Sequence, residues 1–351
     1  MTQSIQSLFN ITEPSPMQRV NAKWTQFDDG EQCSMPQEGV ENAPHQVELW
    51  CKRDDLLHPI ISGNKWRKLH KPLTDFRQDP PNHVLSFGGP YSNHLHALAY
   101  CCYRLNIKFT AIIRGAYLSK QTLNPTLSDL KAWNTNLIYV DKQTYQRKSE
   151  VEYLQQLRHQ LDVDTVIPEG GSQQDALQGM KYMLEEIALV SADKKFDAIV
   201  LPVGSGASMA GIVKGCDNSI ASEVIGIGVL SGKGYLEGLV SQFLGQEKHQ
   251  TSYLPWRIEH DFHFGGYAKT TPELDAFCYT FNQQQVTEFS SATPENHKID
   301  TPIVIEPVYS GKCFYAVKSL IERAYFAPNS RILVIHTGGM QGARAFQHTP
   351  V

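Results

Sequence analysis

Short apolar runs alternate with helical patterns along most of the chain. Helical patterns are clearest at 92–105, 124–133, 149–161 and 175–190. The apolar runs are rich in Val and Ile and lack strict alternation, which is typical of strands buried on both faces. They lie at 84–89, 108–115, 136–141, 165–171, 197–206, 223–232 and 331–339. This order predicts an open α/β fold with mostly parallel sheets and flanking helices.

Two stretches depart from this alternation. The first ~45 residues are polar and contain prolines, so we expect them to lie over the surface. The stretch 246–300 is polar and aromatic, with few strand signals and one helical pattern, TPELDAFCYTFNQQ. We interpret it as a connection with one helix that could line the cleft. In folds of this class ligands bind beyond the carboxyl ends of the strands, where the glycine-rich segments of this chain fall.

Composition narrows the class of protein. A chain of 351 residues with 41% hydrophobic and 19% charged residues is expected to form two domains or one large one. The net charge of -4, without a basic patch, argues against a nucleic-acid partner. Without an apolar run near the ~18 residues of a membrane helix, and without a signal-peptide pattern at the start, we expect no membrane partner. The odd count of seven cysteines favours reduced thiols and a cytoplasmic location.

The segment SGNKWRKLH places Lys65 directly after Gly-Asn and before a cationic cluster. Neighbouring Arg67 and Lys68 would disfavour a further positive charge and lower the pKa of Lys65. A lysine with a lowered pKa can attack carbonyls and form a Schiff base. An ordinary basic surface cluster is the alternative, and this motif alone does not decide between them.

The segment FGGPYSNHLHAL ends a strand with two glycines and opens a helix at Ser92 and Asn93. Helix N-termini present free N–H groups and hold anions such as carboxylates, although plain N-capping by either residue explains the pattern as well. His94 and His96 form an H-x-H pair. On a helix these two side chains point in different directions, so we expect no metal site and interpret both as structural or cleft-lining.

The segment LPVGSGASMAG follows an apolar strand and precedes a helix. Its small residues are suited to wrapping backbone N–H groups around a single phosphate. They are Gly204, Ser205, Gly206, Ala207 and Ser208. No G-K-[ST] follows and no acidic residue ends the next strand, which argues against nucleoside triphosphates and dinucleotides. Two further candidates are Tyr309 in EPVYSGK, expected on a strand-to-helix turn, and Thr337 in IHTGG, at the end of the last strand.

Taken together and in this order, the motifs resemble the pyridoxal-phosphate enzymes that include 1-aminocyclopropane-1-carboxylate deaminase and D-cysteine desulfhydrase. The resemblance runs from about Lys52 to Gly339 through GNKWRKL, FGGPYSNH, IPEGGS, LPVGSGASMAG, HFGGYAKTTPEL, EPVYSGK and IHTGG. It implies the tryptophan-synthase-β-like fold, which is fold type II of the pyridoxal-phosphate enzymes. It also implies pyridoxal 5'-phosphate as cofactor, a small amino acid as substrate and, by analogy, a homodimer.

The resemblance assigns roles to the cofactor-binding candidates. Lys65 would hold the cofactor through a Schiff base and then take the α-proton of the substrate. Asn93 would hydrogen-bond the ring hydroxyl, and the turn from Gly204 to Met209 would bind the phosphate. Thr337 would meet the pyridine nitrogen. A neutral hydroxyl there would not hold that nitrogen protonated, which favours β-elimination over reactions that need a long-lived carbanion.

On the substrate side, the resemblance places Ser92 against the carboxylate and Tyr309 near the reacting atoms. The family commonly has Gln-Ser-Asn-Gln where this chain has Tyr91-Ser92-Asn93-His94. We expect Tyr91 and His94 to border the carboxylate or the leaving group. Ring-opening deaminases have Glu after the tyrosine and Leu before the paired glycines, whereas this chain has Ser310 and Thr337, the desulfhydrase-like pair.

The sequence therefore predicts a two-domain lyase. Residues 70–168 would form a small domain, and residues 1–69 with 169–351 a large cofactor-binding domain. The small domain would close over the substrate and exclude water. The predicted reaction converts D-cysteine to pyruvate, hydrogen sulfide and ammonia. The alternatives are 1-aminocyclopropane-1-carboxylate deaminase, which gives 2-oxobutanoate and ammonia, and more distantly a nucleotide-dependent α/β enzyme or a non-catalytic phosphate-ligand-binding protein.

Overall fold

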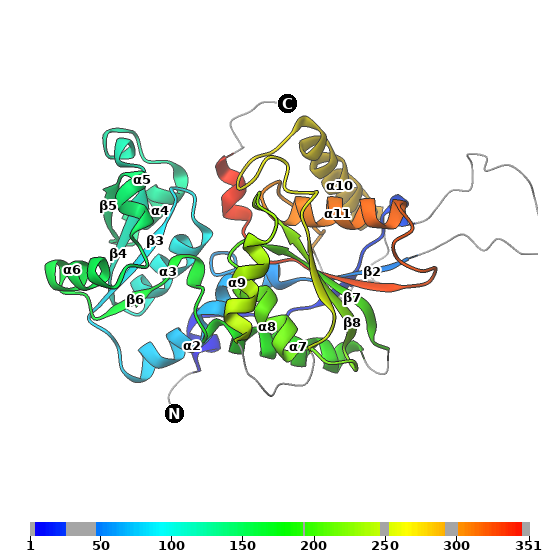
Figure 1. Cartoon of the computed structure of the whole chain (residues 1–351), viewed down its shortest axis with the longest axis horizontal. Coiled ribbons are helices and arrows are strands. Elements are labelled where there is room, and N and C mark those ends of the chain that lie inside the picture. The colour runs from blue at the N-terminus through cyan, green and yellow to red at the C-terminus, as the bar shows by residue number, and fades with distance from the viewer. Residues whose placement is uncertain (1–3, 26–46, 192–193, 246–252, 292–300, 346–351) are drawn as a thin grey trace, which may run out of the picture.

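The computed structural model describes residues 4–25, 47–191, 194–245, 253–291 and 301–345, and its strands form two sheets that lie side by side (Figure 1). The larger sheet has the order β1-β2-β10-β7-β8-β9 and the smaller one the order β5-β4-β3-β6. The larger sheet contains β1 (Met17–Arg19), β2 (Glu48–Lys52), β7 (Phe196–Val203), β8 (Ala221–Gly228), β9 (Trp256–Glu259) and β10 (Arg331–Ile335). The smaller sheet contains β3 (His83–Gly88), β4 (Lys108–Arg114), β5 (Asn136–Val140) and β6 (Thr165–Ile167).

Both sheets are almost entirely parallel, as the sequence predicts. In the larger sheet the pairs β2–β10, β10–β7, β7–β8 and β8–β9 run parallel, and the edge strand β1 pairs antiparallel with β2. All three pairs of the smaller sheet are parallel. Because parallel strands of one sheet end at the same edge, the loops after the neighbouring strands β7 and β10 lie close together.

Helices cover both faces of the larger sheet (Figure 1). One apolar core, which includes Phe281 and Phe314, packs α10 and α11 against it. A second core, which includes Met180 and Val240, packs α7, α8 and α9 on the opposite face. These helices are α7 (Ala176–Ser191), α8 (Ala207–Gly215), α9 (Tyr235–Leu244), α10 (Pro272–Ser291) and α11 (Ser310–Glu322).

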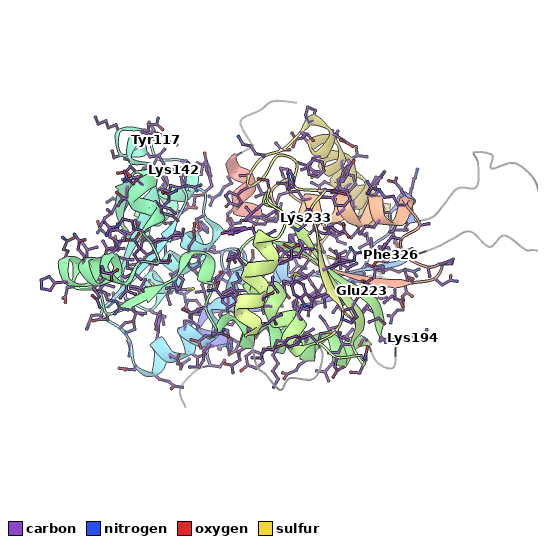
Figure 2. All side chains as sticks on the ribbon, in the orientation of Figure 1. Tyr117, Lys142, Lys194, Glu223, Lys233 and Phe326 are labelled. Atoms are coloured by element: carbon purple, nitrogen blue, oxygen red, sulfur yellow. The ribbon has the colours of Figure 1, made fainter. Side chains whose placement is uncertain are left out.

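The smaller sheet is also covered on both faces. One core, which includes Trp66 and Leu98, joins it to α1, α2, α3 and α4, and another, which includes Tyr153, joins it to α5 and α6. These helices are α1 (Ile5–Phe9), α2 (Asn64–Gln78), α3 (Asn93–Arg104), α4 (Pro125–Ala132), α5 (Lys142–Gln146) and α6 (Val151–Leu161). Figure 2 shows side chains filling both units, with Tyr117 and Lys142 at the end of the molecule opposite Glu223 and Phe326.

Local sequence signals explain where several helices begin. Asn124 caps α4 by accepting a hydrogen bond from the Leu127 N–H at 2.9 Å, and Pro125 occupies the first turn, as predicted. Ser92 caps α3 through the Leu95 N–H at 3.2 Å. No described helix is long and apolar enough to cross a membrane.

The structure corrects three expectations about elements. The stretch 246–300 contributes strand β9 to the larger sheet, and α10 packs in the core instead of lining a cleft. The residues before Tyr309 form an irregular segment and not a strand. Helix α2 runs across position 69, where the sequence placed a domain boundary. Part of the N-terminal surface segment, 26–46, lies outside the described residues.

Candidate functional site

A cavity of about 590 Å³ lies between the two sheets and takes its wall from both units. It collects loops that follow β3, β7 and β10 together with the first turn of α2. Ten of the predicted site residues contribute to its wall: Lys65, Ser92, Asn93, His94, Gly204, Ser205, Gly206, Ser208, Tyr309 and Thr337. Positions far apart in the chain thus meet in one place.

Lys65 lies in the first turn of α2, in the cavity wall. Its surroundings exclude water from the amine, which disfavours the charged form and lowers the pKa of Lys65 from 10.5 to about 8. The lowered pKa agrees with the sequence prediction, but its cause is burial and not the neighbouring Arg67.

Arg67 lies on the side of α2 away from the cavity. Its guanidinium bonds Asp54 at 2.9 and 3.0 Å and Glu186 at 2.7 and 2.8 Å, beneath the helix. Residues one and two positions apart on a helix do not share a face, which is why Arg67 and Lys65 separate. The basic residues that are adjacent in the sequence therefore lie on different faces of α2: Lys65 faces the cavity, and Arg67 faces the protein core.

Lys68 is on the cavity side, and the sequence analysis did not assign it to the site. It is 2% exposed, and among the described residues its ammonium contacts only neutral oxygens. These are Ser205 Oγ at 3.0 Å, Gly170 O at 3.3 Å and Ser172 Oγ at 3.3 Å. Burial first, and then the charge of Lys65, hold the pKa of Lys68 well below its ordinary value. A buried cation among neutral acceptors at the start of α8 is suited to binding an anion.

The backbone of Gly63 joins the Lys65 turn to the end of β10. Gly63 has a φ of 61°, and a Cβ there would lie 1.9 Å from the Thr337 carbonyl oxygen. The next residue, Asn64, donates its N–H to that same carbonyl at 3.1 Å. Only glycine permits so close an approach, so the lysine turn and the threonine turn are held as one piece.

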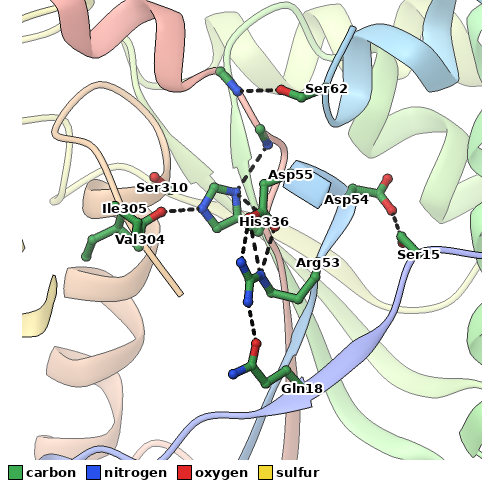
Figure 3. Close-up of polar contacts among 12 residues, drawn as sticks. Ser15, Gln18, Arg53, Asp54, Asp55, Ser62, Val304, Ile305, Ser310 and His336 are labelled. Atoms are coloured by element: carbon green, nitrogen blue, oxygen red, sulfur yellow. Dashed lines mark hydrogen bonds and ion pairs between the residues drawn. The ribbon is translucent and has the colours of Figure 1, made fainter. Parts of the chain in front are cut away.

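Thr337 lines the cavity. Its neighbour His336 makes polar contacts at the end of β10, as Figure 3 shows. His336 Nε2 lies 2.8 Å from the Val304 carbonyl, and His336 Nδ1 lies 3.2 Å from the Gly338 N–H. A carbonyl accepts and an N–H donates, so Nε2 donates to Val304 and Nδ1 accepts from Gly338. The Thr337 backbone is thereby anchored on both sides.

Asn93 connects the smaller unit to the same turn. Its Nδ2 donates to the Gly339 carbonyl at 3.1 Å, and a Cβ on Gly339 would meet that nitrogen at 2.6 Å. Its Oδ1 is buried and has no hydrogen-bond partner in the described structure. A buried oxygen without a donor is costly, so this atom is available to a ligand that brings one.

The two histidines of the H-x-H pair separate, as predicted. His94 lines the cavity with Nε2 at 2.8 Å from Ser86 Oγ, and its buried Nδ1 has no hydrogen-bond partner in the part of the chain that the structure describes. Burial, then Lys65 and Lys68, hold the pKa of His94 well below its ordinary value, so it is neutral. His96 instead bonds Asp129 at 2.8 Å, away from the cavity.

Tyr309 precedes α11, and a buried carboxylate fixes its position. Glu306 accepts the N–H groups of Val308, Tyr309 and Ser310 at 2.7–2.8 Å. Ser310 Oγ also donates to Glu306 at 3.1 Å and does not enter the cavity wall. The turn therefore presents Tyr309 to the cavity and turns Ser310 away from it.

Tyr267 is a cavity residue to which the sequence analysis gave no role. Its hydroxyl lies 3.2 Å from that of Tyr309. Lys312 holds the loop before it by donating to the carbonyls of His263 and Gly266, both at 2.8 Å. The motif HFGGYAK could have indicated this residue, but it lies within the polar stretch 246–300, which the sequence analysis interpreted as a connection.

Two predicted residues are not in the cavity wall. Tyr91 is half-buried and stands between the wall residues Gly89 and Ser92, but it does not itself line the cavity. Ala207 is fully buried as the first residue of α8. The geometry therefore gives no support to a substrate contact by Tyr91.

Comparison with known proteins agrees with this geometry. Residues 38–338 match the model of the pyridoxal-phosphate-dependent enzyme family. A putative 1-aminocyclopropane-1-carboxylate deaminase of Pyrococcus horikoshii is 29% identical over 84% of this chain and 86% of its own. A mitochondrial bifunctional D-cysteine desulfhydrase/1-aminocyclopropane-1-carboxylate deaminase of Arabidopsis thaliana is 27% identical over 85% of this chain and 74% of its own.

Solved structures support the fold. A crystal structure of an ACC deaminase homologue aligns with a TM-score of 0.73 over 99% of this chain and 98% of the other, at 22% identity. A threonine deaminase isoform from Solanum lycopersicum aligns with a TM-score of 0.54 over 84% of this chain and 75% of the other, at 14% identity. With a match that spans most of its length, and with the α/β fold of such enzymes, the chain belongs to the family of pyridoxal-phosphate-dependent enzymes.

Proposed function

We propose that this enzyme is a lyase that removes a β-substituent and the amino group from a small amino acid, with D-cysteine as the main substrate. The products would be pyruvate, hydrogen sulfide and ammonia. The observation that carries the proposal is the pair Thr337 and Ser310. Thr337 offers a neutral hydroxyl in the cavity wall, and Ser310 stands where ring-opening deaminases have Glu.

The residues present fit the cofactor. Lys68, Ser205 and Ser172 would hold the phosphate, because an anion would stabilise the buried Lys68 ammonium, which has no carboxylate partner among the described residues. The unpartnered Oδ1 of Asn93 would accept a hydrogen bond from the ring hydroxyl. Lys65 lies in the same cavity with an amine that is readily uncharged.

The chemistry follows from these positions. Pyridoxal phosphate, when bound, supplies an aldehyde that binds the substrate amine and a ring that makes the α-proton removable. Lys65, with a pKa of about 8, can take and return that proton near neutral pH. The start of α3 at Ser92 would bind the substrate carboxylate. Thr337 would meet the ring nitrogen without supplying a proton, which favours departure of the β-substituent.

The assay that tests the proposal compares two substrates on the purified holoenzyme. D-cysteine should give pyruvate and sulfide, whereas 1-aminocyclopropane-1-carboxylate would give 2-oxobutanoate. The deaminase remains the second candidate, because curated relatives carry that name. Formation of 2-oxobutanoate with no pyruvate from D-cysteine would favour the deaminase and reject the desulfhydrase.

Replacing Lys68 with Met should weaken binding of pyridoxal phosphate about tenfold or more, because a hydrogen bond to a charged group contributes roughly 1.5–3 kcal/mol. Titration of the apoprotein, followed by absorbance, measures the Kd. Pyridoxal, which lacks the phosphate, is the matched control ligand and should bind the variant and the parent protein equally. An equal loss for both ligands would show that Lys68 does not contact the phosphate.

The rate at which the apoprotein captures the aldehyde should rise with pH and level off above about 8. Only the uncharged amine attacks a carbonyl, and the pKa of Lys65 is about 8. At pH 7 about a tenth of such amines are uncharged, against roughly one in 3,000 for an ordinary lysine. Stopped-flow absorbance measures this rate. A rise that continued beyond pH 10 would indicate an unperturbed lysine.

A further inference from the structure

A short helix near the end of the described chain joins the larger unit to the smaller one. This 3₁₀ helix, η6 (Met340–Ala345), follows the Thr337 turn and lies where the larger unit faces the smaller unit (Figure 1). Gln341 anchors it to the segment before α2 by donating to the carbonyls of Pro59 and Ile60 at 2.9 and 3.3 Å. The proposed reaction leaves this helix without a role.

The far end of η6 forms an ion pair with the smaller unit. Arg344 Nη1 donates to Asp129 Oδ2 of α4 at 2.7 Å, and Arg344 Nη2 lies 3.0 Å from His96 Nε2 of α3. His96 Nε2 lies 2.8 Å from the same Asp129 oxygen. Burial would raise the pKa of Asp129, but hydrogen bonds with Arg344 and His96 outweigh burial and hold that pKa below its ordinary value. These three residues form a clasp, in which a charged carboxylate is bound from both units.

The clasp holds α3 and α4, which pack together. The His96 ring lies edge-on to Trp133 at the end of α4, with 4.8 Å between the ring centroids, and both helices contribute to the same apolar core. The start of α4 is tied to the turn that opens α3, because Asn124 Nδ2 donates to the Pro90 carbonyl at 3.2 Å. Pro90 lies two residues before Ser92, the cap of α3. A constraint on either helix is therefore passed to the Ser92 turn.

The segment 337–344 contacts this part of the smaller unit twice. The Gly339 carbonyl accepts a hydrogen bond from Asn93 Nδ2 at 3.1 Å, and the clasp adds a second contact. Asn93 and His96 are three positions apart on α3 and therefore share a face of that helix. That face rests on the segment that also presents Thr337 to the cavity. The clasp thus completes a connection between the two halves of the site.

Arg344 does not line the cavity, so it acts on a ligand only through other residues. We propose that Arg344 is a positioning residue that, through Asp129 and His96, holds the Ser92 turn where the substrate carboxylate binds. This inference rests on the proposed function, in which the start of α3 receives that carboxylate. Loss of the ion pair would leave the turn in place in a smaller fraction of the molecules, and ligand affinity falls with that fraction.

The experiment measures ligand binding by the holoenzyme without turnover. 2-Aminoisobutyrate has an amine and a carboxylate but no α-proton, so it can displace Lys65 from the cofactor and cannot undergo β-elimination. 2-Aminopropane is the matched control ligand, because it has a hydrogen in place of the carboxylate. A titration followed by the absorbance of the lysine-bound cofactor gives the Kd of each ligand.

Arg344→Gln should raise the Kd of 2-aminoisobutyrate about fivefold and leave that of 2-aminopropane unchanged. The expected factor is modest because the side chains of Arg344 and Asp129 are 23% and 36% exposed, and water weakens their attraction. Asp129→Asn breaks the same ion pair, so it should have the same effect, and the double variant should show no further loss. Arg344→Lys keeps the charge and should recover part of the affinity.

The matched control variant is Lys131→Gln, which removes an exposed positive charge of α4 outside the clasp and should change neither Kd. An unchanged Kd of 2-aminoisobutyrate in Arg344→Gln would overturn the inference. An equal rise for both ligands would also overturn it, because it would indicate a general loosening of the site. Additive losses in Arg344→Gln and Asp129→Asn would do the same, because the two side chains would then not act as a pair.

The binding result does not depend on the leaving group. Absence of pyruvate from D-cysteine would reject the proposed reaction, whereas a loss of affinity confined to 2-aminoisobutyrate would still support the clasp. If the parent holoenzyme bound 2-aminopropane and not 2-aminoisobutyrate, the Ser92 turn would not receive a carboxylate and the inference would fall.

Discussion

Replacing Lys65 with Ala should lower turnover of any substrate by a thousandfold or more. Under the proposed function the amine would have two tasks, attack on the aldehyde and transfer of the α-proton, and proton transfer by a positioned group alone contributes about 10²–10⁴-fold. The variant should also lose the visible absorbance of the lysine-bound cofactor. Steady-state kinetics and an absorption spectrum, with and without borohydride, measure both effects.

Chemical rescue separates a chemical role of Lys65 from a structural one. Added methylamine should restore part of the activity of Lys65→Ala, because it supplies a free amine where the side chain is missing. Lys65→Arg keeps a positive charge but cannot act as the amine, so it should remain inactive. Full activity of Lys65→Ala without added amine would reject the assignment of this residue.

Replacing Arg67 with Met should destabilise the fold by about 3–5 kcal/mol, because it leaves the buried carboxylate of Asp54 without its ion-pair partner. Arg67 is 1% exposed and bonds Asp54 and Glu186 beneath α2. Denaturant unfolding of the holoenzyme and of the variant measures the difference. The matched control is Lys71→Met on the same helix, which breaks an exposed ion pair with Asp75 and should lower the unfolding free energy far less than Arg67→Met does.

The pH dependence identifies the cause of this loss. Burial by itself would raise the pKa of Asp54, but Arg67 outweighs burial and holds it below the ordinary value. In the parent protein the stability gained from Asp54 is present above the ordinary Asp pKa and is lost as the pH falls through the lowered one. In Arg67→Met the pKa of Asp54 should instead rise, so acid neutralises the unpaired charge. The difference in unfolding free energy should therefore shrink as the pH falls, and a constant difference would contradict this explanation.

The strands that the sequence predicts correctly are the long apolar ones. Segments such as 108–115 and 197–206 are rich in branched apolar residues because both of their faces are buried. That composition can be recognised from the sequence alone. Strands β2 and β9 are five and four residues long and carry polar or charged residues. Their strand character comes from pairing with β10 and β8, which no local pattern reveals.

The residues of the site also differ in whether a local sequence pattern reveals them. Lys65, Asn93 and Thr337 belong to motifs with a recognisable order, so the sequence can propose them. In the sequence, Lys68 looks like part of a basic surface cluster. In the structure, helix α2 directs Lys68 toward Ser205 and Arg67 toward Asp54. Arg114 and Tyr267 enter the cavity only because the two sheets face each other there. Contacts between distant segments decide these positions.

Helix α2 is fastened to the larger unit, because Gly179 of α7 lies against the Arg67 carbonyl so closely that a Cβ would come within 1.8 Å. The same helix also packs against the smaller sheet, so α2 is one connection between the two units. The segment 168–175 is another connection, and its Gly170 and Ser172 contact Lys68. We expect the domain closure predicted from the sequence to leave this anion-binding corner almost unmoved, because it lies between the two connections, and to displace the Ser92 turn further. Substrate could then enter and product leave while the phosphate-binding end of the cofactor stays in place.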